Sequence, residues 1–333
     1  MAPPLAVTMG EPAGIGGEIT LKAWLARGSD VPAFYVIDDP DRLAALARKL
    51  GWDVPIRPIA NPQEAFSHFA EALPVAPLGR SPRARPGQPD LADAPLIIKA
   101  IEAAVRDVRG GLAAAVVTNP IHKESLTRAG FRHSGHTEYL AELSGMKEGA
   151  VMMLVSSELK VVPVTVHLAL KRAIEALSAA AICHAGRVTD RTLREDFGVA
   201  APVIAVAGLN PHAGEEGTLG EEEGEIVAPA VVSLRESGID ARGPLPPDTM
   251  FYAEARRRYD AALCMYHDQA LIPFKTLDFY GGVNLTLGLP FLRASPDHGT
   301  AFTLAGKGTA RADSMIAALR LAAQIAAKRR LRA

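Results

Sequence analysis

Short runs of apolar residues alternate along the chain with longer segments of helical periodicity. The apolar runs predict β-strands at residues 5–8, 33–37, 113–118, 152–155, 162–166, 203–208 and 261–266. Segments rich in Ala and Leu predict helices at residues 41–50, 94–109, 170–181, 190–197, 222–236 and 312–327. Continuous apolar strands separated by helices are typical of parallel strands buried on both faces of a sheet. The pattern therefore predicts an α/β fold.

Two regions depart from this alternation. Residues 55–89 contain eight prolines and predict a loop-rich excursion within the first domain. The most apolar long window, residues 151–170, is interrupted by Glu158, Lys160 and Pro163 before it reaches the roughly 20 residues of a membrane helix. That window is therefore expected to hold two strands, and no contact with a membrane is expected.

Composition narrows the class of protein. A chain of 333 residues with 48% hydrophobic content is long enough for about two globular domains. Its 36 basic and 37 acidic residues are interspersed and give a net charge of -1, so it lacks the basic surface that nucleic acids require. We expect a small-molecule ligand and no nucleic acid partner.

The two cysteines and the N-terminus bear on the compartment. Cys183 and Cys264 are far apart in sequence and form no C-x-x-C motif, which fits a reducing compartment. Residues 1–5 carry neither the positive charge nor the apolar run of a secretory signal. Both observations favour a cytoplasmic protein.

A glycine-rich turn, TMGEPAGIGGE at residues 8–18, follows the first predicted strand and precedes a helix near Ile19. Such a turn can bring backbone N–H groups close to an anion, or it can be a tight structural turn. It has neither the G-x-G-x-x-G of a Rossmann dinucleotide site nor the G-K-[ST] of a Walker loop. The sequence therefore supports neither of those two nucleotide sites.

Five histidines lie in polar turns at the ends of predicted strands: His136, His167, His212, His267 and His298. In open α/β sheets, ligands bind beyond the carboxyl ends of the strands. His167, His212 and His267 each follow an apolar strand, and three converging imidazoles could hold a divalent metal ion. Their separations of 45 and 55 residues are no local chelating motif, so structural histidines remain the alternative.

Other polar residues extend this picture. Lys275, Asn284 and Arg293 lie in a short, loop-rich stretch and form either a clamp for a phosphate or carboxylate, or ordinary surface charge. Asp268 either orients an imidazole or is a surface carboxylate. Asp248 is a turn acid, or it meets a metal ion or a substrate ammonium group.

Six segments in this order resemble the 4-hydroxythreonine-4-phosphate dehydrogenase family of vitamin B6 biosynthesis: TMGEPAGIG at 8–16, GHTE at 135–138, GLNPHAGE at 208–215, YHDQ at 266–269, VNLTLGLP at 283–290 and DHGTA at 297–301. The resemblance covers nearly the whole chain. It implies two α/β domains around a cleft, similar to isocitrate and isopropylmalate dehydrogenases and not Rossmann. We place the first domain, on the nucleotide side, at residues 1–133 plus 291–333, and the second at residues 134–290.

The resemblance also implies roles for individual residues. The metal ligands would be His167, His212 and His267, holding Zn²⁺, Mg²⁺ or Co²⁺ in a site shared between the subunits of a homodimer. The substrate contacts would be His136, Thr137, Lys275, Asn284 and Arg293. Lys275 is the candidate for proton transfer, and it could instead only bind phosphate. His298, Gly299 and Thr300 would contact the adenosine part of NAD or NADP.

The implied reaction oxidises the 3-hydroxyl of 4-phosphohydroxy-L-threonine, and the resulting 3-oxo acid loses CO2. One alternative is a paralogous dehydrogenase that acts on phosphorylated threonate or on an aromatic cis-dihydrodiol. Two alternatives from other classes are a phosphate acyltransferase of related architecture and a non-catalytic binding module. The three histidines and the His-Gly-Thr segment argue against these last two classes.

Overall fold

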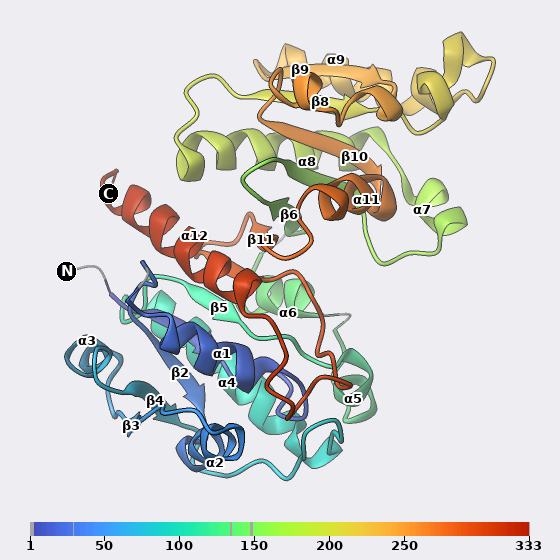
Figure 1. Cartoon of the computed structure of the whole chain (residues 1–333). Helices are drawn as coiled ribbons and strands as arrows, with labels where there is room; N and C mark the ends of the chain where they lie inside the picture. The colour runs from blue at the N-terminus through green and yellow to red at the C-terminus, as the bar shows by residue number, and fades with distance from the viewer. Residues whose placement is uncertain (1–2, 29, 134, 147–148, 333) are drawn as a thin grey trace. The chain divides into compact units, whose positions relative to one another are not determined.

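The computed structural model describes residues 3–28, 30–133, 135–146 and 149–332, and the chain divides into two compact units. The first unit comprises Met1–Ala150 and Leu289–Arg330, and the second comprises Val151–Gly288 and Leu331–Ala333. Strands alternate with helices in both units, as Figure 1 shows. The predicted α/β class is confirmed.

The sheet of the first unit is parallel throughout its described strands. Its strands pair in the order β3-β4-β2-β1-β5-β12. Their bounds are β1 Leu5–Thr8, β2 Phe34–Asp38, β3 Ile56–Pro58, β4 Leu73–Pro77, β5 Val116–Thr118 and β12 Arg293–Pro296. Residues 55–89 therefore contribute the edge strand β3 and its neighbour β4, which the proline-rich sequence did not predict. Pro58 is tolerated in β3 because an edge strand leaves backbone groups unpaired on one side.

Helices cover this sheet on both faces. Their bounds are α1 Gly16–Leu25, α2 Pro40–Leu50, α3 Ala65–His68, α4 Ala94–Arg109, α5 Lys123–Arg128, α6 His136–Leu143 and α12 Asp313–Arg330, with 3-10 turns at Pro62–Glu64 and Leu91–Asp93. In Figure 1, α1 and α12 lie side by side in front of the sheet and α4 lies behind it. Burying each large aliphatic side chain beneath these helices stabilises the fold by about 1.5–3 kcal/mol.

Local sequence explains where a helix such as α2 begins and ends. Asp39 precedes it, and its carboxylate accepts a hydrogen bond from the backbone N–H of Asp41 at 3.3 Å. Pro40 occupies the first helical position, where no N–H donor is needed. Gly51 ends the helix with φ of 68°, a left-handed conformation that glycine adopts without strain. The predicted helix at 41–50 is thus confirmed to within one residue.

The sheet of the second unit is mixed. Its strands pair in the order β11-β6-β7-β10-β8-β9, with the first two pairs antiparallel and the rest parallel. Their bounds are β6 Val151–Val155, β7 Lys160–Thr165, β8 Val203–Ala207, β9 Asp240–Leu245, β10 Ala261–Tyr266 and β11 Val283–Leu287. Strands β6 and β7 are the two strands expected in the apolar window 151–170. Their predicted assignment is confirmed.

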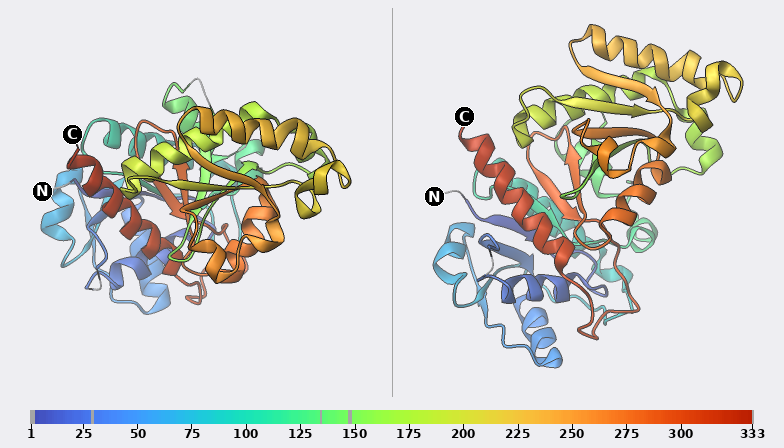
Figure 2. Two further views of the ribbon diagram at one scale, coloured as in Figure 1. Left: turned by 90° about the horizontal axis from the view of Figure 1, so that it is seen from above. Right: turned by 45° about the horizontal axis from the view of Figure 1, so that its top comes forward.

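The helices of the second unit include one correction to the sequence analysis. Their bounds are α7 Leu170–Ala176, α8 Ala179–Thr192, α9 Ala228–Glu236, α10 Ala253–Arg256 and α11 His267–Leu277, with 3-10 or π turns at Leu193–Phe197, Pro211–Gly217, Glu223–Val227 and Pro247–Thr249. The single helix predicted at 170–181 is wrong, because Leu177 is extended and the Ser178 hydroxyl caps a new helix by accepting from Ala181 N–H. Figure 2 shows α9 beside β9.

The division into units differs from the predicted domains at residues 134–150, 289–290 and 331–333. Helix α6 belongs to the first unit, whereas the prediction placed it in the second; residue 134 itself lies outside the described residues. Tyr139 and Leu140 of α6 are buried in the core of the first unit, and the Tyr139 hydroxyl donates to Glu102 of α4 at 2.7 Å. These contacts account for the position of α6.

Two further expectations concern the cysteines and the membrane. Cys183 and Cys264 are both buried and unbridged, in line with small apolar side chains, and burial raises the pKa of the Cys264 thiol. Among the described helices, none has the length and apolar character that crossing a bilayer demands.

Candidate active site

Two of the candidate metal ligands lie together at the carboxyl ends of neighbouring parallel strands in the second unit. His167 follows β7 and His267 follows β10, and the register of these strands pairs Thr165 with Tyr266. The two imidazole rings have centroids 6.0 Å apart. Both line one cavity of about 240 Å³, together with Thr165, Tyr266 and Asp268. The parallel register thus explains why residues 100 positions apart in sequence meet.

The third candidate, His212, follows β8 and lines a second cavity of about 390 Å³ with Asn210, Asp248, Tyr266 and Gln269. Tyr266 lines both cavities. Within residues 3–28, 30–133, 135–146 and 149–332, no group of three or more His, Cys, Asp or Glu side chains is placed to hold one metal ion. One chain therefore brings together His167 and His267 but does not add His212 to them.

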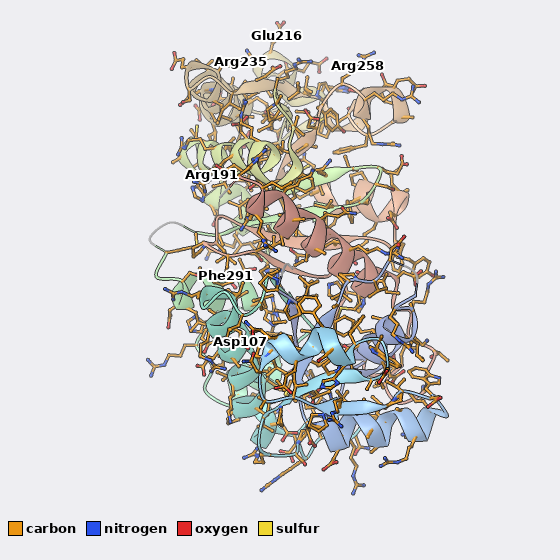
Figure 3. All side chains as sticks on the ribbon, turned by 90° about the vertical axis from the view of Figure 1, so that its left-hand side faces the viewer. Asp107, Arg191, Glu216, Arg235, Arg258 and Phe291 are labelled. Carbon is orange, nitrogen blue, oxygen red and sulfur yellow. The ribbon has the colours of Figure 1, made fainter. Side chains whose placement is uncertain are left out.

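The backbone at His167 and His212 is unusual. Their φ angles are 55° and 54°, in the left-handed region that residues other than glycine seldom adopt. His212 begins a run that continues through Ala213, Gly214, Glu215 and Glu216, all with positive φ. Glu216 is exposed and extends outward from this turn, as Figure 3 shows. Backbone strain of this kind clusters at functional sites.

The carboxylate of Asp268 lies beside the imidazole of His267. Its Oδ1 is 2.6 Å from His267 Nδ1. An N–H at Nδ1 that donates to this oxygen leaves the Nε2 lone pair available to a ligand. Of the two roles considered for Asp268, the geometry favours the orientation of an imidazole. Asp248 shares the cavity of His212, where its carboxylate can meet a cation.

Two candidate substrate contacts also lie in the second unit. Asn284 is on β11, and its Oδ1 is buried without a hydrogen-bond partner among the residues that the structure describes. Lys275 is on α11, with Nζ 5.2 Å from the centroid of the Phe279 ring. A buried, unsatisfied amide oxygen is costly, so Asn284 Oδ1 is suited to accept a hydrogen bond from a ligand.

Arg293 is the charged centre of a polar cluster in the first unit. It begins β12, is only 3% exposed, and donates to Thr118 Oγ1 from Nε at 3.2 Å and from Nη2 at 2.6 Å. Burial lowers the pKa of Arg293 to about 10, and the negative charge of Glu138 opposes that shift. The guanidinium therefore stays positive at neutral pH, in a position where little water screens it.

His136 and Thr137 begin α6 in the same unit. The Nε2 atom of His136 is buried and has no hydrogen-bond partner in the described part of the chain. Burial lowers the pKa of His136 well below its ordinary value, and the positive charges of Arg293 and Lys123 lower it further. His136 is thus a neutral imidazole beside two cations, a combination suited to an anionic ligand.

Lys123 and Thr118 are members of this cluster that the sequence analysis missed. Lys123 begins α5, a helix that was not predicted, and its Cε lies 3.1 Å from the position of a Cβ on Gly135. Thr118 could have been found, because it ends the predicted strand at 113–118, where α/β proteins place ligand contacts.

The segment with His298, Gly299 and Thr300 packs against the glycine-rich turn. The Ile15 N–H donates to the Thr300 carbonyl at 3.0 Å, and a Cβ on Gly14 would lie 2.9 Å from that oxygen. The turn is therefore a support for this segment, in line with a tight structural turn. His298 Nε2 is buried and lacks a hydrogen-bond partner within the described residues, while Nδ1 lies 3.1 Å from the Gly299 carbonyl.

Comparison with known families decides the relationship that the motifs indicated. The family model described as pyridoxal phosphate biosynthetic protein PdxA matches residues 30–322. The chain belongs to the PdxA family. This confirms the resemblance drawn from the six sequence motifs.

Relatives and solved structures agree with membership in the PdxA family. A 4-hydroxythreonine-4-phosphate dehydrogenase of Bradyrhizobium diazoefficiens is 54% identical over 339 residues, covering 98% of each chain. The crystal structure of a 4-hydroxythreonine-4-phosphate dehydrogenase from Klebsiella pneumoniae superposes with a TM-score of 0.85 at 40% identity, covering 97% of this chain and 99% of that one.

A more distant structure represents one of the alternatives. The terephthalate 1,2-cis-dihydrodiol dehydrogenase of Burkholderia xenovorans LB400 has a TM-score of 0.64 at 26% identity, covering 97% of this chain and 98% of that one. Identity to the solved 4-hydroxythreonine-4-phosphate dehydrogenase of Klebsiella pneumoniae is higher, 40% against 26%. The alternative of a cis-dihydrodiol substrate is therefore less well supported than the PdxA assignment.

Proposed function

We propose that this chain is a 4-hydroxythreonine-4-phosphate dehydrogenase of pyridoxal 5'-phosphate biosynthesis. It oxidises 4-phosphohydroxy-L-threonine at the 3-hydroxyl to 2-amino-3-oxo-4-phosphooxybutanoate, which loses CO2 to give 3-amino-2-oxopropyl phosphate. The observation that carries this proposal is the 54% identity to a dehydrogenase of that name over 98% of both chains. When bound, a nicotinamide cofactor, NAD or NADP, would supply the acceptor for the hydride of carbon 3.

Arg293, His136 and Thr137 are assigned to the substrate phosphate. The buried Arg293 guanidinium offers a fixed fork of donors, and His136 Nε2 is an unsatisfied atom beside it. Lys123 adds a second positive charge near His136. A phosphate held in this way positions the reacting carbon, so that binding energy far from the reaction contributes to the rate.

Lys275 and Asn284 are the other two proposed substrate contacts. The amide oxygen of Asn284 is buried and unsatisfied, which suits a substrate hydroxyl or ammonium donor. Lys275, which is half-buried on α11, is proposed as the group that accepts the proton of the 3-hydroxyl. Binding of phosphate is the second role open to it.

His167, His212 and His267 would hold a divalent cation, and imidazole nitrogens suit Zn²⁺ and Co²⁺ better than Mg²⁺. The fit rests on the strained backbone of His167 and His212 and on the orientation of His267 by Asp268. When bound, the ion would lower the pKa of the 3-hydroxyl and stabilise the negative charge that develops during loss of CO2.

We also propose a homodimer that shares each metal site between its subunits, so that one chain need not bring all three histidines to the same ion. Large apolar side chains are exposed in the second unit. Leu168 and Leu170 line the cavity of His167 and His267, and Ile272, Phe279 and Tyr280 lie in or just after α11. Exposed apolar residues in such numbers favour a protein interface. The closed two-fold symmetry of most homo-oligomers makes a second copy of the chain the natural partner.

The nucleotide is assigned to His298, Gly299 and Thr300 in the first unit. The unsatisfied Nε2 of His298 supplies one donor or acceptor for an adenosine. The glycine-rich turn fixes the Thr300 carbonyl through Ile15 and leaves no room for a side chain at Gly14. The segment is thus presented on a rigid support.

The decisive assay follows absorbance of the reduced nicotinamide after the protein is mixed with NAD, a divalent metal and 4-phosphohydroxy-L-threonine. We expect turnover with this substrate to exceed turnover with phosphorylated threonate or an aromatic cis-dihydrodiol. A preference for either of those would transfer the assignment to the paralogous dehydrogenases. Acyl transfer to phosphate in the absence of nicotinamide and metal would identify an acyltransferase instead.

A further inference from the structure

The turn that carries His212 lies on a buried carboxylate that the reaction does not use. Glu223 begins the π turn Glu223–Val227 and is only 5% exposed. Its Oε1 accepts the backbone N–H groups of Leu209 at 2.7 Å and Asn210 at 2.6 Å. Its Oε2 accepts the side-chain amide of Asn210 at 2.9 Å. One carboxylate therefore satisfies three donors immediately before His212.

The glycines around this carboxylate leave space for it. A Cβ on Gly208 would lie 3.1 Å from Glu223 Oε1, and a Cβ on Gly214 would lie 2.7 Å from Oε2. Gln269 holds the same segment at a second point, because its Nε2 donates to the Gly208 carbonyl at 2.7 Å. Residues on both sides of His212 thus pack directly against Glu223.

The conformation of the turn explains why such support is needed. His212, Ala213, Glu215 and Glu216 all have φ between 43° and 56°. A run of non-glycine residues in the left-handed region is unfavourable, and it persists only where surrounding contacts over-determine it. Hydrogen bonds to an ionised acceptor are about twice as strong as neutral ones, so a carboxylate suits this task.

We propose that Glu223 is a positioning residue that fixes the left-handed turn and, through it, the imidazole of His212. The functional part of this inference rests on the proposed role of His212 as a metal ligand. The structural part concerns the turn alone and is measurable in metal-free protein. The two parts are tested by separate readouts on the full-length chain.

Hydrogen–deuterium exchange of the metal-free protein tests the turn. In Glu223→Ala, two backbone N–H groups lose their acceptor, so we expect exchange in peptides spanning 208–217 to rise at least about tenfold. Glu223→Gln keeps the volume and one carbonyl oxygen for those N–H groups, so we expect a smaller increase. Unchanged exchange in both variants would overturn the proposal.

Two variants serve as controls. Of the three donors that Glu223 accepts, Glu222 accepts only the Asn210 side-chain amide, at 2.7 Å. Glu222→Gln should therefore leave hydrogen exchange at residues 208–217 as in the wild type. Asp93→Ala removes a buried carboxylate that accepts the N–H groups of Arg83 and Ala84 in the first unit. Like Glu223→Ala, this variant removes a buried carboxylate that accepts two backbone N–H groups, but in a different part of the chain. It should raise hydrogen exchange only near residues 83–84.

Titration with Co²⁺ as the probe tests the functional part, because the visible absorption of Co²⁺ reports its ligands. We expect the apparent Co²⁺ affinity to fall at least about tenfold in Glu223→Ala, less in Glu223→Gln, and not in Asp93→Ala. If Glu223→Ala binds Co²⁺ with the affinity of the wild type, the proposal that Glu223 positions His212 is wrong. Failure of the wild type itself to bind Co²⁺ would refute the proposed metal site, while the exchange experiment still decides whether Glu223 holds the turn.

Discussion

The Arg293 guanidinium donates two hydrogen bonds to the Thr118 hydroxyl, from Nε at 3.2 Å and from Nη2 at 2.6 Å. Thr118 ends β5 and Arg293 begins β12, which pair in parallel. The threonine fixes the direction of a buried charge before any ligand arrives. A pre-oriented donor loses less entropy on binding than a mobile surface side chain would.

This relationship makes Arg293 the most informative residue of the proposed phosphate site. We expect Arg293→Ala to raise the KM for the phosphorylated substrate and to lower kcat, each by about tenfold or more, since an unanchored phosphate no longer positions the reacting carbon. Arg293→Lys keeps the charge without the fork and should recover only part of the loss. The control is Arg242→Ala, which removes an exposed arginine paired with Asp240. Wild-type kinetics in Arg293→Ala would remove this residue from the site.

The lowered pKa of His136 predicts a dependence of stability on pH. The folded protein keeps this imidazole neutral, whereas the unfolded chain protonates it near its ordinary pKa of 6.5. The unfolded state therefore binds more protons below that pH, and the free energy of unfolding falls as the pH falls through about 6.5. We expect His136→Gln to reduce the loss of Tm between about pH 7.5 and about pH 5.5 relative to wild type.

The control for this comparison is His68→Gln, a histidine at the end of α3 in the same unit. It should keep the wild-type pH dependence. Equal losses of Tm in wild type and His136→Gln would show that burial of a neutral His136 does not lower the stability of the protein at acidic pH. Thermal unfolding followed by circular dichroism at both pH values gives the answer without any substrate.

Removal of the divalent ion gives a prediction for the histidine set. Treatment with a chelator should abolish dehydrogenase activity, and Zn²⁺, Co²⁺ or Mg²⁺ should restore it, because the developing oxyanion needs a nearby positive charge. His212→Ala should resist restoration, and binding of the nicotinamide followed by fluorescence should stay unchanged in that variant. Full turnover by metal-free protein would exclude the three histidines from a catalytic metal site.

The sequence predicted those elements of the fold whose hydrophobic pattern matches the way they pack. Residues 5–8, 261–266 and 94–109 match β1, β10 and α4 to the residue, because each carries a continuous or periodic apolar pattern. Strands β3 and β4 were not found, since prolines hid their apolar positions. The break between α7 and α8 was missed because Leu177 continues the helical pattern while its backbone is extended.

The candidate site was readable only in part. The proximity of His167 and His267 follows from two predicted strands that pair side by side, although sequence does not give the strand order. The pairing of Arg293 with Thr118 spans 175 residues, and no local pattern indicates it. The sequence did not indicate a role for Glu223, because a glutamate in an acidic stretch is expected at the surface, and only the structure shows that it is buried.

Assembly supplies the last prediction, which tests how the two subunits of the proposed homodimer divide the histidines of the shared metal site. If His267 reaches the ion from the subunit opposite to His167, each site needs one of these residues from each chain. The His167→Ala homodimer and the His267→Ala homodimer should then both be inactive. After random mixing, about half of the dimers are heterodimers.

In each heterodimer one site collects both lost ligands, while the other collects both intact ones. The mixture should therefore regain about a quarter of wild-type activity, half of the dimers each with one working site of two. Subunit exchange is verified separately by mass spectrometry of chains that carry different tags. If exchange occurs and activity does not return, both histidines serve the same site from one chain, and the 6.0 Å between their ring centroids in this structure is the arrangement that binds the ion.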